Sequence, residues 1–484
     1  MSILYRDILY PILEELQYDE KSLASCFKVS KTWCEIVIPI LWRNPWEHLT
    51  LGKKELLLKV IISHLSDEER TNLSQHFSFI TKSHKKLLFN YISYCRHLNL
   101  EIIEDMFIIH NQYMGIRNNI LKLFINKNVK YTHLYIPGYY DYHLIPGTER
   151  CFSEIKFLKC NGRVNDKNLI MLTKVCKSIK ELQLFLYECS NNHGISKLIE
   201  SQESLYEISF LNTYSPCDVL FCKVIENSLI KHANTIQYFN TCVQPQTQIL
   251  ASFVNLKTLI LKYNYEFDRC RWYYIENVSL PSLQFLDANT INTESLTSLI
   301  KNSGEKLTKI RIFNSLAFSN VDNNKKIIQA IYQSCPNLKY LELYYKDSNI
   351  LELEKLLIKC QYLNKLEICS ESINWNRLFN ILAISSPPNL FKFKIYFPVN
   401  KLKLDSLKLF FDNWKGRHPM SLIIGTENNF TYKNQLNNLI NNYKAKGVVN
   451  DFTYYDSETK AKNVVKDLKS KTVDIFNGFK KLFN

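Results

Sequence analysis

The sequence predicts an α/β solenoid in which a strand and a helix alternate about every 26 residues, behind an N-terminal unit of three short helices. An apolar-x-x-apolar-x-apolar pattern recurs twelve times between Tyr131 and Ile424. Segments with apolar residues at helical spacing lie between these patterns, and more of them fill the first 46 residues. One strand and one helix cannot bury their apolar faces alone, so we expect the units to stack into a curved solenoid with one continuous core.

Residues 1–48 are expected to form the three short helices. Their apolar residues recur at helical spacing, first in the stretch from Ile8 to Leu16. Asp19 and Ser30 can cap the second and third helices. Pro11 and Pro39 fall inside the apolar stripes, so each either kinks its helix or shifts its boundary. A unit this small is near the limit of independent stability, and its leftover apolar surface should bury against a partner.

The order and spacing of short motifs in this stretch resemble an F-box, and particularly the expanded F-box families of fungi. The family's usual Leu-Pro opening is Leu4-Tyr5 here. The motifs that carry the resemblance are Leu4, Asp7-Ile8-Leu9, Ile12-Leu13, Leu16, Ser22-Leu23, Val29-Ser30, Trp33 and Leu41-Trp42-Arg43.

This resemblance implies docking onto the Skp adaptor of an SCF-type cullin–RING ubiquitin ligase, and through the adaptor onto the cullin and RING subunits. The alternative is an ordinary helical cap at the end of the solenoid. The residues that the resemblance assigns to adaptor binding are Leu4, Tyr5, Ile8, Leu9, Ile12, Leu13, Leu16, Leu23, Val29, Trp33, Leu41 and Trp42.

Residues 49–130 predict a helical bridge with the first irregular repeats. Apolar periodicity indicates helices near Lys53–Leu65 and Ile116–Phe124, and a first strand is expected within Tyr94–Leu100. The bridge contains no linker rich in Pro, Gly or Ser, so we expect it to join the two parts rigidly.

Residues 131–455 hold the repeats, with helices expected between the strands, for example over Asp166–Cys176 and Thr293–Ile300. Cys176, Cys335 and Cys360 each stand three residues before the first apolar position of a strand. This placement resembles the cysteine-containing leucine-rich repeats that commonly follow an F-box. We expect these cysteines to be small buried apolar residues rather than metal or redox groups. The twelve strand patterns begin at Tyr131, Ile155, Ile179, Leu205, Ile236, Leu256, Leu283, Leu307, Leu338, Leu363, Leu390 and Pro419.

The positions between the apolar residues of each strand should line the concave sheet, and in the later repeats they are rich in Lys and Arg. Such rows with aromatic residues suit an acidic or phosphorylated protein segment. The alternative is a mixed, solvated face. The residues predicted to bind a substrate are Lys257, Lys309, Arg311, Lys339, Tyr340, Lys365, Lys392 and Lys394.

Missing motifs, the distribution of apolar residues and the net charge limit the classes of function that we expect. No Gly-rich phosphate loop, metalloprotease motif or serine-nucleophile motif occurs, so we expect neither catalysis nor a cofactor or metal. The early apolar stretch is interrupted by charges, and no apolar run is long enough for a membrane span, which favours a cytoplasmic or nuclear protein. The net charge of +15 favours acidic partners without choosing among them.

Residues 456–484 lack the repeat and predict a basic amphipathic helix, which either covers the end of the solenoid or lies on an anionic membrane.

The function we favour is that of a substrate receptor whose solenoid presents a protein to the ligase. The alternatives are a non-catalytic scaffold without a ligase role, and a basic protein that binds nucleic acid or a membrane surface.

Overall fold

The computed structural model describes residues 3–455 except 18, 27, 48, 50, 75–86, 109–113, 139, 187–191, 212–217, 263–271, 290, 313–320, 371, 398–401 and 427–432. The chain divides into two compact units. The first comprises Met1–Phe185 with Cys189–Ser204, and the second comprises Leu186–Glu188 with Leu205–Asn463. The helix predicted over residues 456–484 lies outside the described residues.

Three helices open the first unit, as predicted: α1 (Ile3–Glu15), α2 (Glu20–Cys26) and α3 (Lys31–Leu41). Pro11 and Pro39 lie inside α1 and α3 without ending them. The expected caps are present. The Asp19 carboxylate accepts hydrogen bonds from the backbone N–H and the hydroxyl of Ser22, at 3.1 and 2.6 Å. The Ser30 hydroxyl accepts one from the backbone N–H of Trp33 at 3.3 Å.

The bridge that follows contains α4 (Leu51–Ile62), α5 (Asp67–Ser74), the 3-10 helix η1 (Tyr91–Tyr94), β1 (His97–Asn99), α6 (Leu100–Ile108) and α7 (Met114–Phe124). It is hydrogen-bonded directly to the end of the three-helix unit. The backbone N–H groups of Arg96 and His97 donate to the carbonyl of Arg43 at 2.9 and 3.1 Å. The Trp46 indole N–H donates to the carbonyl of His97 at 2.6 Å. The bridge is therefore attached directly to the three-helix unit.

The repeats of the first unit pair their strands in parallel and in chain order from β1 to β4. Leu134, Leu158 and Leu182 occupy matching register positions and are almost fully buried beneath the sheet. The elements are β2 (His133–Ile136), η2 (Tyr142–Leu144), α8 (Thr148–Cys151), β3 (Phe157–Asn161), α9 (Asp166–Val175), β4 (Glu181–Phe185) and α10 (Asn192–Glu200).

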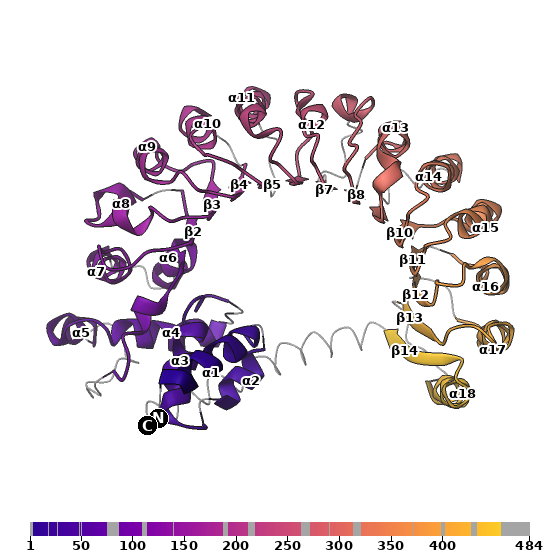
Figure 1. Cartoon of the computed structure of the whole chain (residues 1–484), viewed down its shortest axis with the longest axis horizontal. Helices are drawn as coiled ribbons and strands as arrows, with labels where there is room; N and C mark the ends of the chain where they lie inside the picture. The colour runs from indigo at the N-terminus through magenta and orange to yellow at the C-terminus, as the bar shows by residue number, and fades with distance from the viewer. Residues whose placement is uncertain are drawn as a thin grey trace. The chain divides into compact units, whose positions relative to one another are not determined.

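The second unit continues the alternation of strand and helix, with parallel pairing in chain order from β5 to β14. Figure 1 shows its strands along the inner side of the unit and its helices along the outer side. Its strands are β5 (Glu207–Leu211), β6 (Tyr238–Thr241), β7 (Thr258–Lys262), β8 (Phe285–Asn289), β9 (Lys309–Ile312), β10 (Tyr340–Tyr344), β11 (Lys365–Cys369), β12 (Lys392–Phe397), β13 (Met420–Thr426) and β14 (Val449–Tyr455).

The helices of the second unit connect these strands. They are α11 (Val219–Leu229), α12 (Ile249–Ser252), α13 (Thr293–Ser303), α14 (Val321–Ser334), α15 (Ile350–Lys359), α16 (Trp375–Ser385), α17 (Leu404–Asn413) and α18 (Lys433–Ala445). Short 3-10 helices lie at η3 (Ile230–His232), η4 (Tyr273–Ile275), η5 (Gly304–Lys306) and η7 (Asp347–Asn349).

The buried core accounts for the spacing of the apolar residues in the repeat pattern. Ile310, Leu341 and Leu366 occupy one register position on neighbouring strands and are nearly inaccessible to solvent. Side chains alternate between the two faces of a strand, so the residues between these positions lie on the opposite face of the sheet. All twelve predicted strands are present, and the structure confirms the solenoid of strand–helix repeats. It adds β14, which was not predicted.

The cysteines before the strands behave as expected. Cys176, Cys335 and Cys360 are almost fully buried. The Cys176 thiol donates to the carbonyl of Phe152 at 3.0 Å. Burial raises the pKa of the Cys176 and Cys360 thiols to about 12, which keeps them protonated and unreactive at neutral pH.

Candidate functional site

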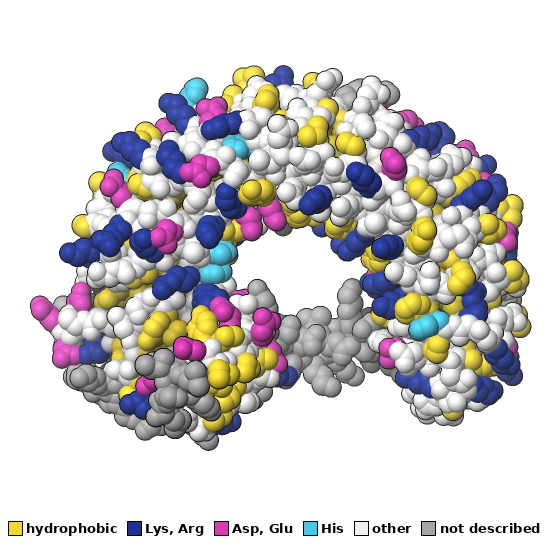
Figure 2. Space-filling view, in the orientation of Figure 1, with side chains coloured by type: hydrophobic (Ala, Val, Ile, Leu, Met, Phe, Trp, Pro, Cys, Tyr) yellow, Lys and Arg dark blue, Asp and Glu magenta, His cyan; other side chains and the backbone are white. Residues whose placement is uncertain are grey.

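The strands of the second unit bring the predicted substrate-binding residues together in two rows across the sheet. The rows are defined by the parallel register of β8 to β12. The first row holds Phe285, Lys309, Tyr340, Lys365 and Lys392, and the second holds Asp287, Arg311, Glu342, Glu367 and Lys394. We call these ten residues the charged face. Figure 2 shows Lys and Arg side chains along the inner side of this unit.

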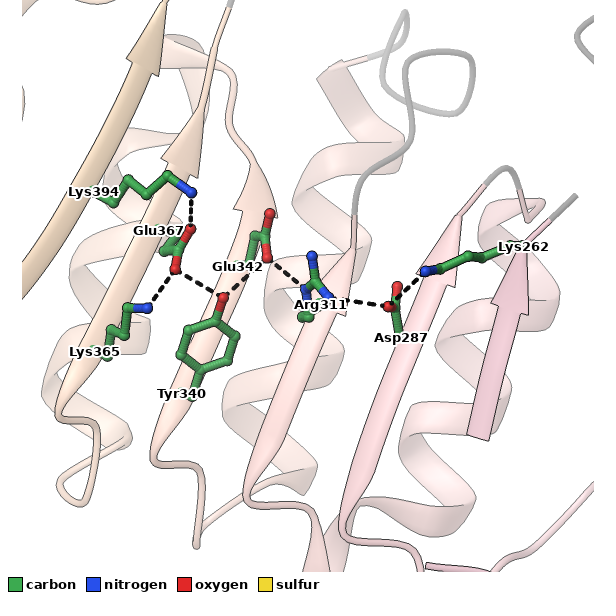
Figure 3. A network of polar contacts seen from close by, with 8 residues as sticks. All are labelled: Lys262, Asp287, Arg311, Tyr340, Glu342, Lys365, Glu367 and Lys394. Carbon is green, nitrogen blue, oxygen red and sulfur yellow. Dashed lines mark hydrogen bonds and ion pairs between the residues drawn. The ribbon is translucent and has the colours of Figure 1, made fainter. Parts of the chain in front are cut away.

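Ion pairs connect the second row across neighbouring strands (Figure 3). The Arg311 Nε lies 2.7 Å from a Glu342 oxygen, and its Nη1 lies 3.3 Å from Asp287. Lys262, at the end of β7, lies 3.4 Å from the same Asp287 oxygen.

A second set of ion pairs converges on Glu367. The ammonium groups of Lys365 and Lys394 lie 2.7 and 2.8 Å from its carboxylate oxygens. Burial alone would raise the pKa of Glu367, but the hydrogen bonds from the two lysines outweigh it and lower the pKa. The carboxylate therefore stays ionised and holds both lysines in place.

Acidic and basic groups differ in depth on this face. The side chains of Asp287, Glu342 and Glu367 are only 9%, 18% and 8% exposed. Those of Arg311 and Lys394 are 41% and 46% exposed. A ligand approaching the sheet therefore meets hydrogen-bond donors first, with the carboxylates beneath them.

Tyr340 lies at the centre of the charged face. Its hydroxyl oxygen is 3.0 Å from a Glu342 oxygen and 2.9 Å from a Glu367 oxygen. A hydroxyl has one hydrogen, so it donates to one carboxylate at a time. Burial and the nearby charge of Glu342 raise the pKa of Tyr340, which keeps the hydroxyl protonated as a donor.

Two lysines of the first row make no ion pair within the described part of the chain. The Lys309 ammonium lies 4.4 Å from the ring centre of Phe285 and 5.0 Å from that of Tyr340. The Lys392 ammonium lies 5.4 Å from the ring centre of Phe391. Aromatic faces attract such cations without neutralising their charge, so both lysines remain available to an anionic ligand.

The remaining predicted residues, Lys257 and Lys339, are exposed and directly precede β7 and β10. The prediction of a basic stripe placed its cations together but did not include Asp287 as their partner. It also did not include Glu342 and Glu367, whose carboxylates neutralise part of the stripe. The parallel register joins these groups across strands, and it follows the repeat pattern. Asp287, Arg311 and Glu342 each stand between the second and third apolar residues of their pattern.

The predicted adaptor-binding residues separate into a core and a surface. Leu9, Leu13 and Leu23 are buried inside the three-helix unit. Trp42 is also buried, and its ring centre lies 4.9 Å from that of Tyr91 in the bridge. These four side chains therefore hold the unit together and attach it to the rest of the first unit. Leu16, Trp33 and Leu41 are half-buried.

Three of the predicted residues lie on the surface. Ile8, Ile12 and Val29 are 57%, 55% and 59% exposed. Figure 2 shows hydrophobic side chains, with acidic side chains beside them, on the surface over α1 to α3. Leu4 and Tyr5 belong to α1, but their side chains are outside the described part of the structure.

Arg43 fixes α1 against the end of α3. Its guanidinium Nη2 lies 2.8 Å from the Glu14 carboxylate and donates to the Tyr10 hydroxyl at 3.2 Å. Its Nη1 donates to the Gln17 side chain at 3.3 Å. The hydrogen bond that Arg43 donates to Glu14 outweighs partial burial and raises the pKa of Arg43. The exposed isoleucines are thus carried on a helix that is held in a fixed orientation.

Among the described residues, no group of three or more His, Cys, Asp or Glu side chains could hold a metal ion. None of the described helices combines the length and the hydropathy that a membrane crossing requires.

No protein-family model and no curated protein matches the chain. Among solved structures, the chain is similar to the crystal structure of the leucine-rich repeat-containing protein LegL7 from Legionella pneumophila. The sequence identity is 15% and the TM-score is 0.34, and the match covers 63% of this chain and 95% of that one.

Proposed function

We propose that this chain is the substrate-recognition subunit of an SCF-type cullin–RING ubiquitin ligase, acting in the cytoplasm or nucleus. Its three N-terminal helices dock on the Skp adaptor. The charged face of the second unit holds an acidic or phosphorylated segment of a target protein. The chain carries out no chemistry itself. It raises the rate of ubiquitin transfer by holding the target near the conjugating enzyme.

The observation that supports adaptor docking is the exposure of Ile8 and Ile12. These residues are one helical turn apart and share one side of α1. Val29, just before α3, adds a third exposed apolar side chain. Clustered apolar side chains at a protein surface favour burial against a partner. The F-box-like motifs of the same stretch favour the Skp adaptor as that partner.

The charged face favours a protein target over nucleic acid. Asp287, Glu342 and Glu367 lie among the cations Arg311 and Lys394 along the second row. A nucleic-acid strand would bring a continuous series of phosphates over these carboxylates, whereas a protein segment can place its anionic groups selectively.

Co-purification with the Skp adaptor tests the proposal. The full chain co-expressed with the adaptor should elute with it in size-exclusion chromatography. A variant with Ile8→Asp and Ile12→Asp should lose the adaptor while it keeps its circular dichroism spectrum. Ile384→Asp is the matched control, because Ile384 is 70% exposed on α16, in the second unit. That variant should bind as the unmodified chain does.

The second candidate is an interaction scaffold without a ligase role, which the charged face alone would support. In that case the unmodified chain would not co-purify with the adaptor although it folds. Strongly salt-dependent binding of RNA, DNA or anionic vesicles, unaffected by the isoleucine substitutions, would instead support a basic surface binder.

A further inference from the structure

We infer that the charged face selects an extended protein segment with carboxylates at positions i and i+4 and no acidic residue at i+2. This inference rests on the proposed function only in taking the charged face as the target-binding surface.

Two basic anchors lie at the ends of the central part of the face. The first is the pair Lys309 and Arg311 on β9, and the second is the pair Lys392 and Lys394 on β12. Each pair consists of residues two apart on one strand, which therefore lie on the same face of the sheet. One lysine of each anchor, Lys309 or Lys392, makes no ion pair among the described residues and retains its full charge.

The strands between the anchors have the opposite character. Glu342 on β10 and Glu367 on β11 occupy the register positions between Arg311 and Lys394. The Tyr340 hydroxyl bridges the two carboxylates, and Lys365 pairs with Glu367. A ligand that crosses the sheet thus meets the positive charge of the first anchor. It then passes a region where Lys365 and Tyr340 bind the two carboxylates, and it reaches the positive charge of the second anchor.

The spacing of the strands converts this order into a sequence rule. Neighbouring parallel strands are about 4.8 Å apart, so the three steps from β9 to β12 span about 14 Å. An extended chain rises about 3.3 Å per residue, so four residues cover about 13 Å, and side chains at i, i+2 and i+4 point the same way. Residues i and i+4 therefore reach the two anchors, while residue i+2 lies over Tyr340, Glu342 and Glu367.

The direction of the ligand follows from the same arrangement. A segment running along β10 or β11 would follow a strand that carries Glu342 or Glu367. A segment running across the strands reaches both anchors and passes the carboxylates only once. Crossing the strands is therefore the orientation that charge complementarity favours.

The charge of the face fits carboxylates. On β9 to β12 the two rows carry five cations, Lys309, Arg311, Lys365, Lys392 and Lys394, and two carboxylates. Lys262 and Asp287 of the same ion-pair network add one charge of each sign, so the net charge is +3. Two carboxylates leave this surface positive, whereas two phosphoryl groups of about −1.5 to −2 each would match or exceed its charge. The Nη2 group of Arg311 makes no hydrogen bond with a described residue, so it can donate to an anionic group of a ligand.

Fluorescence anisotropy with labelled Gly/Ser peptides tests the rule on the full chain. The peptides carry two glutamates at i and i+2, i and i+3, i and i+4, or i and i+6. The i, i+4 peptide should bind about tenfold more tightly than the others. A third glutamate at i+2 should weaken binding, although it makes the peptide more negative.

Variants of the chain locate the anchors. Lys309→Gln and Lys392→Gln each remove a cation without removing an ion pair, and each should reduce the affinity of the i, i+4 peptide to that of a peptide with one glutamate. The matched controls are Lys359→Gln on α15 and Lys408→Gln on α17, two exposed lysines on the helices. They should leave the affinity unchanged, and circular dichroism should show that all four variants fold.

Affinity that follows total peptide charge regardless of spacing would overturn the inference, as would the absence of binding to every peptide. An i, i+4 phosphoserine pair that binds more than about tenfold more tightly than the glutamate pair would overturn the assignment to carboxylates. These outcomes are independent of adaptor docking, because the peptide assay contains no adaptor. Loss of adaptor binding would likewise leave the peptide result intact.

Discussion

Among individual residues, Glu104 and Arg117 form a buried ion pair in the first unit, with side chains only 4% and 10% exposed. The Arg117 Nε lies 2.7 Å from one Glu104 oxygen, and Tyr142 donates to the other at 3.1 Å. Glu104→Ala leaves the guanidinium buried without its partner and should lower the free energy of unfolding by about 3–5 kcal/mol. Urea unfolding measures this loss. Glu149→Ala, at an exposed position, is the control. Equal midpoints for both variants would contradict the assignment.

The stacked rings of His97 and His133 predict a dependence on pH at the same scale. Their ring centres are 3.7 Å apart. Burial, followed by the charges of His133 and Arg43, lowers the pKa of His97 to about 3, and burial also lowers the pKa of His133. Below pH of about 6.5 the unfolded chain binds protons that the folded chain does not, so this stability is present above that pH and is lost on acidification.

The temperature of the thermal unfolding midpoint should accordingly decrease when the pH is lowered from 7 to 5. The fall should be smaller in His97→Phe, which retains an aromatic ring but cannot be protonated. An identical pH profile for that variant would show that His97 does not titrate with folding.

Among the secondary-structure elements, Asn324 links α14 to the segment that follows β10. Its buried amide donates to the carbonyl of Tyr344 at 2.9 Å and accepts from the backbone N–H of Lys346 and the side chain of Asn349. Asn324→Leu leaves these groups unsatisfied and should cost about 1–3 kcal/mol in unfolding free energy. Lys325→Ala, an exposed change on the same helix, should be nearly neutral by the same denaturation assay. Similar losses in both variants would contradict this reading.

The secondary-structure elements that could be predicted from the sequence are those whose buried residues recur at a fixed spacing. The twelve strands were predictable because aliphatic residues such as Leu259 and Leu286 return at fixed spacing and are fully buried. β14 was not predicted, although Val449, Phe452 and Tyr454 keep the spacing of the pattern. Phe452 and Tyr454 are only half-buried. Of the two alternatives at Pro11, the shifted helix boundary is absent, since α1 runs from Ile3 to Glu15 with Pro11 inside it.

Across the whole molecule, the sequence located both candidate surfaces but not their internal organisation. The positions of Lys309, Arg311 and Lys394 followed from the alternation of strand residues. The ion pair of Arg311 with Asp287 was not predicted, because the predicted site contained only basic residues and Tyr340, although the two residues hold the same position in neighbouring repeats. In the N-terminal unit, the motif resemblance grouped Trp42 with Ile8, whereas Trp42 is buried against the bridge and Ile8 is exposed.

The proposed function requires two separate surfaces, an apolar one on α1 and a charged one on β8 to β12. Each can be removed without the other, because the residues that form them belong to different units. A Lys309→Gln and Lys392→Gln double variant should therefore keep its adaptor while it loses the i, i+4 peptide. Loss of adaptor from this variant, measured by size-exclusion chromatography, would contradict the separation of the two activities.

Titration calorimetry of the full chain with purified Skp adaptor tests the central claim most directly. We predict saturable one-to-one binding that is weakened at least about a hundredfold by Ile8→Asp with Ile12→Asp, since both side chains would place charge in an apolar interface. Ile384→Asp should leave the affinity unchanged. Absence of binding by the folded, unmodified chain, or equal affinity for the Ile8→Asp and Ile12→Asp variant, would contradict the account.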